Sequence, residues 1–337
     1  MSAPVLSVRD LVVEFDGPHG PVRVVDGVSF DVGAGEVLGI VGESGSGKSV
    51  SLLAVMGLLP AGARVAAGEI RFDGQRIDDA PEARMRALRG GAISMIFQDP
   101  MTSLNPVLRI GTQIGEAIRL HAPRTPKAEL RARVEALLAS VGVPDPETRA
   151  RQFPHEFSGG MRQRAMIAMA IANGPKLLIA DEPTTALDVT IQAQVMDVLE
   201  GVCARKHASM ILVTHDLGLV AETADRIAVM YSGRIAETAP TDALFARPSH
   251  PYTRGLLDSL PTLDADHDEL RSIPGQPPDM AARPHGCAFH PRCALGQGRP
   301  ACSRERPDLR TVGTRHAAAC HYAEEAAGDA PPREAAQ

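Results

Sequence analysis

Tryptophan is absent from this chain of 337 residues, and aromatic residues of all kinds make up only 3% of it. Hydrophobic residues nevertheless reach 44%, so small aliphatic side chains must pack a core that suffices for one large or two ordinary domains. No apolar run approaches the roughly 20 residues of a membrane-spanning helix, and Met1-Ser2-Ala3-Pro4 lacks the basic start of a signal peptide. We therefore expect a cytoplasmic protein that cannot cross a bilayer by itself.

An excess of basic residues is also missing. The chain contains 35 lysines and arginines against 41 aspartates and glutamates, which gives a formal net charge of −6. Domains that bind nucleic acid usually carry a basic excess, because they must neutralise phosphates. The charge balance therefore predicts that nucleic acid is not a partner of this protein.

One glycine-rich stretch follows the apolar run Val37–Val41 and precedes an apolar-periodic segment, which is the strand–loop–helix context of a phosphate-binding loop. Its glycines let successive N–H groups converge on an anion, and the following helix points its positive dipole end there. Lys48 can reach the β- and γ-phosphates, and Ser49 offers a hydroxyl to Mg²⁺. We predict a nucleoside triphosphate site made of Gly42, Glu43, Ser44, Gly45, Ser46, Gly47, Lys48 and Ser49.

Polar side chains also follow three further predicted strands. The apolar strand 177–180 is followed by Asp181 and Glu182, and in a parallel sheet ligands bind at that carboxyl edge. Asp181 can hold Mg²⁺, and Glu182 can accept a proton from an attacking water. His215 and Gln98 come after two other strands. Each signal is weak alone, since an Asp-Glu pair is common on surfaces and a lone histidine is usually structural; their shared location favours catalysis.

A second glycine pair opens a helix at Ser158-Gly159-Gly160. Like the first loop, it offers backbone N–H groups, a hydroxyl and a helix dipole to an anion. Phe15, one of the few aromatic residues, lies in an N-terminal region of short predicted strands. From the sequence pattern alone, ordinary strand packing is the preferred interpretation of Phe15.

With these motifs in this order, the chain resembles the ATP-binding subunits of ABC transporters. The matching motifs are the phosphate loop, Gln98, Ser158-Gly159-Gly160, Asp181-Glu182, Ala186-Leu187-Asp188 and His215. Phe157 and Met161 replace the commoner Leu and Gln beside the glycine pair. The resemblance implies an α/β P-loop NTPase fold of the ABC type, with a mostly parallel sheet flanked by helices and a small antiparallel β-subdomain. It also implies that Phe15 stacks on adenine.

The resemblance further implies a mechanism in which two such domains close head to tail around ATP. ATP and Mg²⁺ are then the cofactors, with Ser49, Gln98 and Asp181 around the metal, and Glu182 and His215 are the catalytic residues. The signature residues of one subunit face the ATP held by the other; they are Ser158, Gly159, Gly160 and Met161. Hydrolysis reopens the dimer and moves a membrane partner attached to the helical insertion.

Within this family, the chain is similar to the ATPase subunits of dipeptide and oligopeptide importers over roughly residues 5–322. The segments typical of that branch are 98–106 and His250-Pro251-Tyr252-Thr253. The expected partners are two transmembrane permease subunits, a second related ATPase or another copy of this chain, and indirectly an extracytoplasmic peptide-binding protein. The chain is then peripheral, at the cytoplasmic face of the inner membrane. Nickel importers share much of the pattern, so nickel is an alternative cargo.

Composition and motifs predict three parts in chain order. Residues 1–240 are expected to form the nucleotide-binding domain, with an all-helical subdomain inserted at 102–156. Residues 241–322 are expected to form an irregular, turn-rich extension that needs a metal to fold, because its apolar pattern is poor. Residues 323–337 are predicted to be a disordered tail.

The extension contains four of the five cysteines, Cys287, Cys293, Cys302 and Cys320, with the spacing C-x5-C-x8-C-x17-C. Such a cluster in a cytosolic protein favours metal binding over disulfides. The spacing fits neither a paired zinc knuckle nor a compact ferredoxin motif, so Zn²⁺, an iron–sulfur cluster and unligated thiols all stay open. The family resemblance implies a [4Fe–4S] cluster. His290, His316 and His321 are nearby reserve ligands, but simple exposure to solvent is the preferred interpretation of all three. Cys203 is predicted to be a small buried apolar residue.

Two other functions fit parts of this pattern. One is a soluble ABC-type ATPase that acts on nucleic acid or ribosomes, which the acidic charge balance and the His-Pro-Tyr-Thr segment oppose. The other is a regulator that binds nucleotide without hydrolysing it, which the intact Glu182 and His215 oppose.

Overall fold

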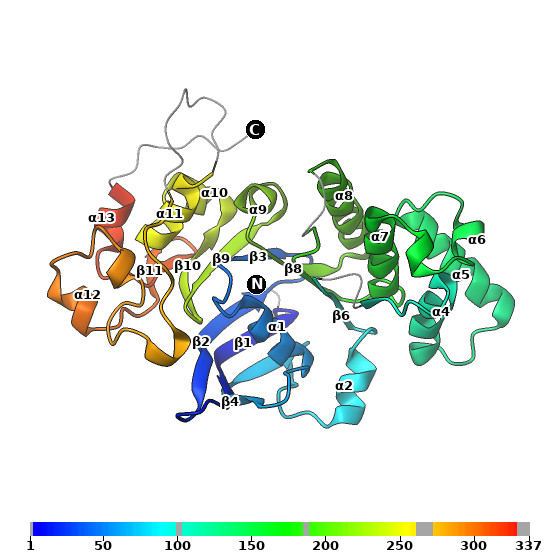
Figure 1. Cartoon of the computed structure of the whole chain (residues 1–337), viewed down its shortest axis with the longest axis horizontal. Helices are drawn as coiled ribbons and strands as arrows, with labels where there is room; N and C mark the ends of the chain where they lie inside the picture. Colours follow the sequence, from blue (N-terminus) through cyan, green and yellow to red (C-terminus); the bar gives the residue numbers. More distant parts are fainter. Residues whose placement is uncertain (1–2, 99–102, 185–188, 261–271, 329–337) are drawn as a thin grey trace. The chain divides into compact units, whose positions relative to one another are not determined.

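The computed structural model describes residues 3–98, 103–184, 189–260 and 272–328. The chain divides into two compact units, each built from several segments. Unit 1 consists of Met1–Leu6, Val32–Glu36 and Phe72–Val213, and unit 2 consists of Ser7–Asp31, Val37–Arg71 and Thr214–Gln337. Figure 1 labels the helices and strands of both units.

A parallel sheet forms the centre of unit 1, with the strand order β8-β7-β6. The strands are β6 (Ile93–Ile96), β7 (Leu177–Asp181) and β8 (Ser209–Thr214). All their residues are buried, which explains why the sequences are nearly continuous apolar runs rather than alternating ones. The carboxyl ends of the three strands share one edge, where Asp181 ends β7.

Helices pack against this sheet. Helix α7 (Gly159–Ala170) contacts both β6 and helix α8 (Val189–Lys206). Cys203 on α8 is 6% exposed, which confirms the prediction of a small buried residue, and burial raises the pKa of its thiol to about 11. Unit 1 also contains the short strand β5 (Gln75–Arg76) and helix α2 (Glu82–Leu88).

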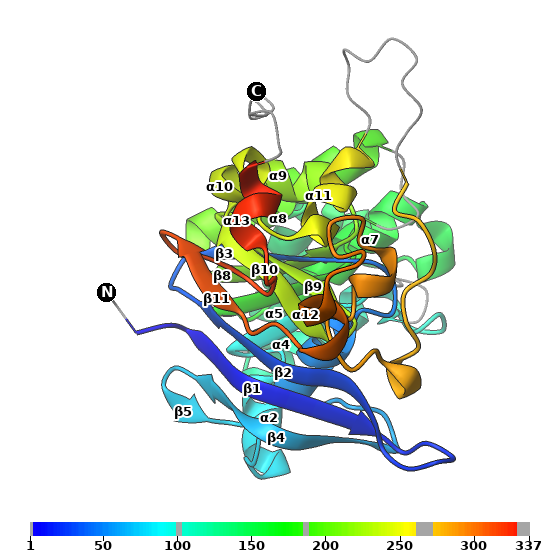
Figure 2. The ribbon, with the colours of Figure 1, turned by 90° about the vertical axis from the view of Figure 1, so that its left-hand side faces the viewer.

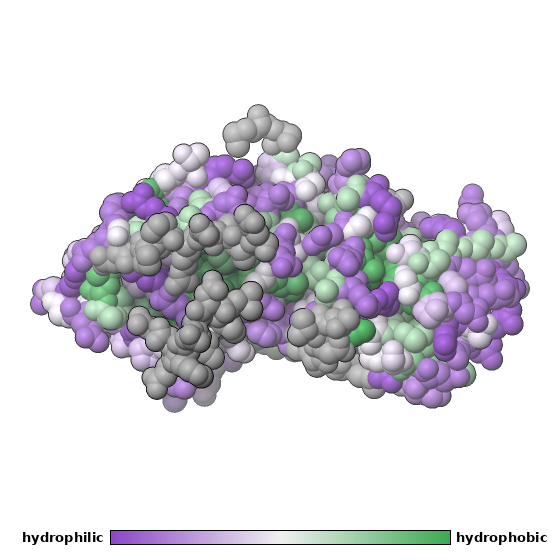
Figure 3. Space-filling model, turned by 90° about the horizontal axis from the view of Figure 1, so that it is seen from above, coloured by the Kyte–Doolittle hydropathy of each residue, from purple (hydrophilic) through white to green (hydrophobic). Residues whose placement is uncertain are grey.

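Between residues 103 and 156 the described chain forms no strand. Its elements are α4 (Ile110–His121), α5 (Lys127–Ser140), α6 (Pro146–Arg149) and the 3-10 helix η1 (Pro154–Glu156). Ile110, Ile114 and Ile118 are fully buried, since their spacing of four places them on one face of α4, which packs against α5 and α7. In Figure 3 the visible face of this helical insertion, at the right, is mostly hydrophilic.

Unit 2 contains two sheets. In the first, the strand order is β2-β1-β4, with β1 (Leu6–Phe15), β2 (Val22–Val32) and β4 (Ala63–Phe72). The sequence predicts a break between residues 8 and 12, but β1 is continuous. Asp10 takes a left-handed backbone with φ +47°, and its N–H donates to Ser29 Oγ. The strand therefore continues through a local irregularity at this polar position.

The second sheet of unit 2 has the order β11-β12-β10-β9-β3. Its strands are β3 (Val37–Val41), β9 (Arg226–Tyr231), β10 (Arg234–Pro240), β11 (Arg310–Gly313) and β12 (His316–Ala318). β3 and β9 are parallel, and the other pairs are antiparallel. The predicted β9–β10 hairpin is confirmed: Ser232 and Gly233 form its two-residue turn with φ +46° and +77°, as the strand twist requires.

Helices of unit 2 cover the face of β9 and β10 that points away from the first sheet. Figures 1 and 2 agree that α10, α11 and α13 lie on this side, with β1 and β2 on the other. The helices of unit 2 are α1 (Lys48–Met56), α9 (Leu217–Thr223), α10 (Thr241–Ala246), α11 (Pro251–Asp258), η2 (Met280–Ala282), η3 (His290–Arg292), α12 (Pro300–Arg304) and α13 (Ala323–Gly328).

The C-terminal extension is more regular than its composition suggests. β12 pairs with β10 through Glu237 and Ala318, so the extension joins an existing sheet and shares its buried face. The prediction of a disordered tail is wrong for residues 323–328, because Ala323, Ala326 and Ala327 pack inward on one side of α13; residues 329–337 lie outside the described part. In the described ranges, no helix is both long and apolar enough to span a membrane.

Candidate functional site

The phosphate loop connects β3 to α1, as the strand–loop–helix pattern predicts. Gly42 has φ +151°, and a Cβ atom there would lie 2.2 Å from the carbonyl oxygen of Met230. Gly47 caps α1 with φ +98°. A side chain at either position would collide with a neighbour or force a disfavoured backbone, so the loop shape depends on these glycines.

Lys48 closes over the loop from the first turn of α1. Its side chain is 6% exposed, and its Nζ donates to the carbonyl oxygens of Gly42, at 2.7 Å, and Glu43, at 3.0 Å. The ammonium charge is therefore held inside the curve of the loop, where an anion bound by the loop N–H groups would meet it.

The β9–β10 turn supports the loop from behind. The N–H of Gly233 donates to the carbonyl oxygen of Ser46 at 2.8 Å, and the carbonyl oxygen of Gly233 accepts from the N–H of Asp26 at 2.9 Å. Sequence analysis missed this support, although Ser232-Gly233 stands out as a turn signal. The turn thus links β2 to the middle of the loop.

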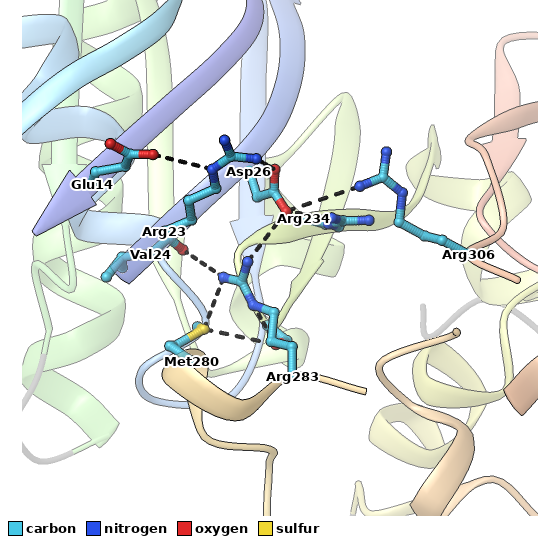
Figure 4. Close-up of polar contacts among 9 residues, drawn as sticks. Glu14, Arg23, Val24, Asp26, Arg234, Met280, Arg283 and Arg306 are labelled. Carbon is cyan, nitrogen blue, oxygen red and sulfur yellow. Dashed lines mark hydrogen bonds and ion pairs between the residues drawn. The ribbon is translucent and has the colours of Figure 1, made fainter. Parts of the chain in front are cut away.

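Asp26 is also the centre of a group of ion pairs, drawn in Figure 4. Its carboxylate pairs with Arg234 on β10, with Arg283 at 3.3 Å and with Arg306 at 4.0 Å. Burial would raise the pKa of Asp26, but the bond from Arg234 and the charges of Arg283 and Arg306 outweigh it and hold the pKa below its usual value. Arg283 also donates to the carbonyl oxygen of Val24 at 3.3 Å, so residues of the extension reinforce the strand behind the loop.

In unit 1, the predicted catalytic carboxylates lie at the end of β7. Asp181 is 6% exposed and Glu182 is half-buried. Glu182 has a left-handed backbone with φ +48°, and its N–H donates to the carbonyl oxygen of Val213 at 2.8 Å. Gln98 Nε2 donates to Glu182 Oε2 at 2.9 Å. The structure therefore brings Gln98 and Glu182 together, as their common position after strands predicts.

The second glycine motif begins α7. Ser158 is the N-cap, and its Oγ accepts from the N–H of Met161 at 3.3 Å. Ser158 and Gly159 are exposed, and a Cβ on Gly159 would have open space around it. The start of α7 is therefore accessible to another molecule.

Gln163 connects this helix to the β7 end, and sequence analysis missed it. The side chain is 2% exposed, and its Nε2 donates to the carbonyl oxygen of Pro183 at 2.5 Å. A glutamine on the buried side of a helix is the sequence signal that could have identified it. Through this bond, the signature helix is tied to the residue that follows Glu182.

The remaining predicted site residues lie in unit 2. Phe15 ends β1 and is partly exposed, His215 follows β8 and is exposed, and Ser49 is half-buried in the first turn of α1. Ser44 and Gly45 are exposed at the tip of the phosphate loop. The loop Ala186-Leu187-Asp188 lies outside the described residues.

The four clustered cysteines converge. Together with His290 and His321, they line one cavity of about 10 Å³, and none of them forms a disulfide. Two thiols accept backbone bonds, Cys293 Sγ from Gly296 N at 3.2 Å and Cys320 Sγ from Tyr322 N at 3.4 Å. Within the described ranges, no three His, Cys, Asp or Glu side chains are arranged to hold a metal ion. The metal site expected from the sequence is thus not preformed.

These thiols also influence one another's ionisation. Burial, together with the neighbouring Cys293 and Cys302, raises the pKa of Cys287 to about 11. Burial likewise raises the pKa of Cys320 to about 12, again with a contribution from the other three thiols. The cluster therefore stays protonated at neutral pH unless a cation is present to stabilise the thiolates.

Comparisons with known proteins match both parts of the chain. A family model described as "ABC transporter" matches residues 25–185, and one described as "Oligopeptide/dipeptide transporter, C-terminal region" matches residues 236–302. The dipeptide transport ATP-binding protein DppD of Escherichia coli (strain K12) is 49% identical over 324 residues, 96% of this chain and 98% of that protein. DppD of Bacillus subtilis (strain 168) is 52% identical over 290 residues, 86% of each chain.

Solved structures support the fold. The dimeric structure of the ATP-binding cassette MJ0796 in a post-hydrolysis state bound to ADP and Pi has a TM-score of 0.64 to this chain, at 24% sequence identity. The match covers 70% of this chain and 98% of the cassette. The α/β P-loop fold expected from the motifs is thereby confirmed.

Proposed function

This chain belongs to the family of ABC transporter ATP-binding proteins, among the dipeptide and oligopeptide transport members, and from this premise we propose that it hydrolyses ATP to power peptide import. The observation that carries the proposal is how far along the chain the sequence similarity to these proteins extends. It extends through the C-terminal region, beyond the nucleotide-binding part that a general ABC model matches. We also propose a functional division near residue 240, with residues 241–322 as the transporter-specific extension.

The test is copurification followed by an uptake assay. The chain, produced with its membrane partners in vesicles, should drive ATP-dependent accumulation of labelled peptide and not of nickel. If the vesicles accumulated nickel and no peptide, nickel would be the cargo instead. Copurification with ribosomes or DNA in place of membrane subunits would overturn a transport role.

Unit 2 supplies the ATP-binding half of the proposed chemistry. Lys48 would bind the β- and γ-phosphates and Ser49 would bind Mg²⁺, while Phe15 would stack on adenine. The support is the inward position of the Lys48 ammonium, within 3.0 Å of two loop carbonyl oxygens, and the glycine-dependent shape of the loop. Gln98 and Asp181 are proposed as further Mg²⁺ ligands, as the motif resemblance implies.

Hydrolysis would depend on Glu182 as the general base, with His215 close to the γ-phosphate. The Gln98 amide that donates to Glu182 Oε2 orients this carboxylate, which would accept a proton from water. Glu182→Gln should lower turnover by roughly 10²–10⁴-fold, the usual contribution of a general base, with ATP binding retained. Unchanged turnover in Glu182→Gln would show that Glu182 is not the general base.

We also propose that two ATPase subunits pair head to tail. The exposed Ser158 and Gly159 at the start of α7, followed by Gly160 and Met161, would contact the ATP of the opposing subunit, a related ATPase or a second copy of this chain. Two transmembrane permease subunits are the further partners, at the cytoplasmic face of the membrane. Val107 and Leu120 support a contact there, since these apolar residues of the helical insertion are 74% and 76% exposed.

Finally, we propose that Cys287, Cys293, Cys302 and Cys320 hold a [4Fe–4S] cluster. Four thiolates are the usual ligands of such a cluster, and backbone N–H groups commonly bond to its sulfur ligands. Zn²⁺ is the alternative, since four thiolates can also hold it tetrahedrally.

The four cysteines fit such a cluster in two respects: their thiolates are suitable donors, and their side chains converge. All four thiols line one small cavity. A bound cluster would cross-link segments of an extension with little apolar core of its own.

Iron and sulfide analysis after anaerobic purification tests this proposal. The full chain should contain about four of each per molecule, Cys302→Ser should lose both, and Cys203→Ser, on α8, should keep them. Colourless protein with zinc but no iron would overturn it.

A further inference from the structure

Glu43, the second residue of the phosphate loop, is held by two residues of the C-terminal extension. Its backbone N–H donates to Tyr252 Oη at 2.8 Å. Its carboxylate accepts two parallel bonds from Arg292, from Nη1 at 2.7 Å and from Nη2 at 2.9 Å. Tyr252 is fully buried, and the Arg292 side chain is 5% exposed against 27% for Glu43, so the extension supplies the buried side of both contacts.

Arg292 is itself rigidly placed. Its Nε donates to the carbonyl oxygen of Pro274 at 2.9 Å, and its Nη1 also reaches Tyr231 Oη at 3.3 Å. The guanidinium lies 5.9 Å from the ring centre of Tyr231 and 5.8 Å from that of Phe289, within the range of a cation–π contact. A guanidinium held by these contacts can keep a carboxylate in one position.

Scarce aromatic residues gather at this point. Tyr231, Tyr252 and Phe289 form a cluster with ring centres 4.5–5.4 Å apart. Two of the three tyrosines in the chain are therefore packed beneath the phosphate loop. Packing of this kind fixes the Tyr252 hydroxyl, so the acceptor for the Glu43 N–H has little freedom to move.

We propose that Tyr252 and Arg292 are positioning residues of the ATP site, and that the extension holds the phosphate loop in its binding shape. The inference rests on the proposed ATP-binding function of the loop. Because the Glu43 N–H points to Tyr252, it is withdrawn from the anion and fixes the start of the loop. A glycine-rich loop that is already ordered has less conformational entropy to lose when a ligand binds.

We expect the loss of either residue to weaken ATP binding and to leave the hydrolysis step largely unchanged. Releasing Glu43 adds the cost of ordering this residue to the cost of binding, so ATP binding should weaken by roughly tenfold. Both substitutions leave the proposed general base Glu182 unchanged, so kcat at saturating ATP should stay within about twofold. The same arginine directly precedes Cys293, so the segment that carries the cysteines is also the one that holds the loop.

The experiment measures the Kd of ATP by calorimetry and KM and kcat by phosphate release, on the full-length chain. Arg292→Ala and Tyr252→Phe should each raise Kd and KM about tenfold, and Arg292→Lys should recover part of the loss. Arg310→Ala is the matched control, because Arg310 makes an equally bidentate pair with Glu324 in the same extension and should leave Kd unchanged.

A purely structural role predicts a different result: a lower Tm with an unchanged Kd in Arg292→Ala and Tyr252→Phe, which would overturn the proposal. Tyr252→Phe decides the question if Arg292→Ala does not fold, since it removes only the hydroxyl and keeps the ring packing. If the wild-type chain itself binds no ATP, the proposed function is wrong. The Kd measured for the wild-type chain distinguishes that case from a failure of the present inference.

Discussion

Glu237 on β10 and His316 on β12 form a buried pair, with His316 Nε2 2.6 Å from Glu237 Oε1 and no part of Glu237 exposed. The same carboxylate accepts the backbone N–H groups of Ser249, at 2.6 Å, and His250, at 2.9 Å. One side chain of the central sheet therefore holds both the start of α11 and the added strand β12. The extension is attached to the core by polar bonds in the interior.

Replacing Glu237 should destabilise unit 2 strongly. Glu237→Ala leaves two backbone N–H groups and an imidazole buried without acceptors, and each unpaired donor costs about 1–3 kcal/mol. We expect the free energy of unfolding in urea to fall by about 3 kcal/mol or more. Glu324→Ala is the control, since Glu324 is 65% exposed in its pair with Arg310 and its loss should leave the free energy of unfolding nearly unchanged. Equal losses in both variants would contradict this account.

His250 should make the stability depend on pH. Burial lowers the pKa of His250 from 6.5 to about 4, although the nearby Glu237 charge acts in the opposite direction. Between these values the unfolded chain binds a proton that the folded chain does not, so the free energy of unfolding is fully retained above pH 6.5. It should fall by about 3 kcal/mol as the pH drops from 6.5 through 4.

Urea unfolding at pH 7, 6, 5 and 4 measures this effect. His250→Asn is the control, because the amide oxygen can still accept the Tyr252 N–H that His250 Nδ1 accepts at 3.0 Å but does not titrate. The variant should show a flatter profile over this range. Parallel profiles for the two proteins would show that another group is responsible.

Gln163 should affect both stability and turnover. Gln163→Leu keeps the side-chain size but removes the bond to the Pro183 carbonyl oxygen, so we expect a loss of about 1–3 kcal/mol and a lower kcat, since Pro183 directly follows Glu182. Gln113→Leu is the matched variant: Gln113 is also buried and donates to Asn105 and Leu108 carbonyl oxygens, but far from the carboxylates in sequence. It should lose stability without a comparable loss of kcat in ATPase assays.

The glycines of the phosphate loop should differ in tolerance. At Gly42 a Cβ atom would lie 2.2 Å from Met230 oxygen, whereas at Gly45 it would meet nothing within 4 Å, despite φ +76°. Gly45→Ala should therefore cost only the left-handed backbone penalty of about 1–2 kcal/mol, and Gly42→Ala should displace the loop and abolish measurable ATP binding. Calorimetric titration with ATP compares them, and similar affinities for the two variants would refute the steric argument.

Much of the architecture follows from local patterns. The run Val37–Val41, the glycines after it and the helix from Lys48 are adjacent in sequence, so their order alone predicts the phosphate loop. The Ser232-Gly233 turn predicts its hairpin for the same reason. Helix α13 was missed because its buried face is made of alanines, which give a weak hydrophobic period.

By itself, the sequence determined the class of chemistry, because phosphate binding needs specific residue types at fixed short spacing. It also placed Gln98 and Glu182 at a common edge, since parallel strands align their ends. Only the tertiary structure decided what holds the loop in place. Glu43 and Arg292 are 249 residues apart, and no local period encodes a contact of that separation; it arises only when the extension packs against the core.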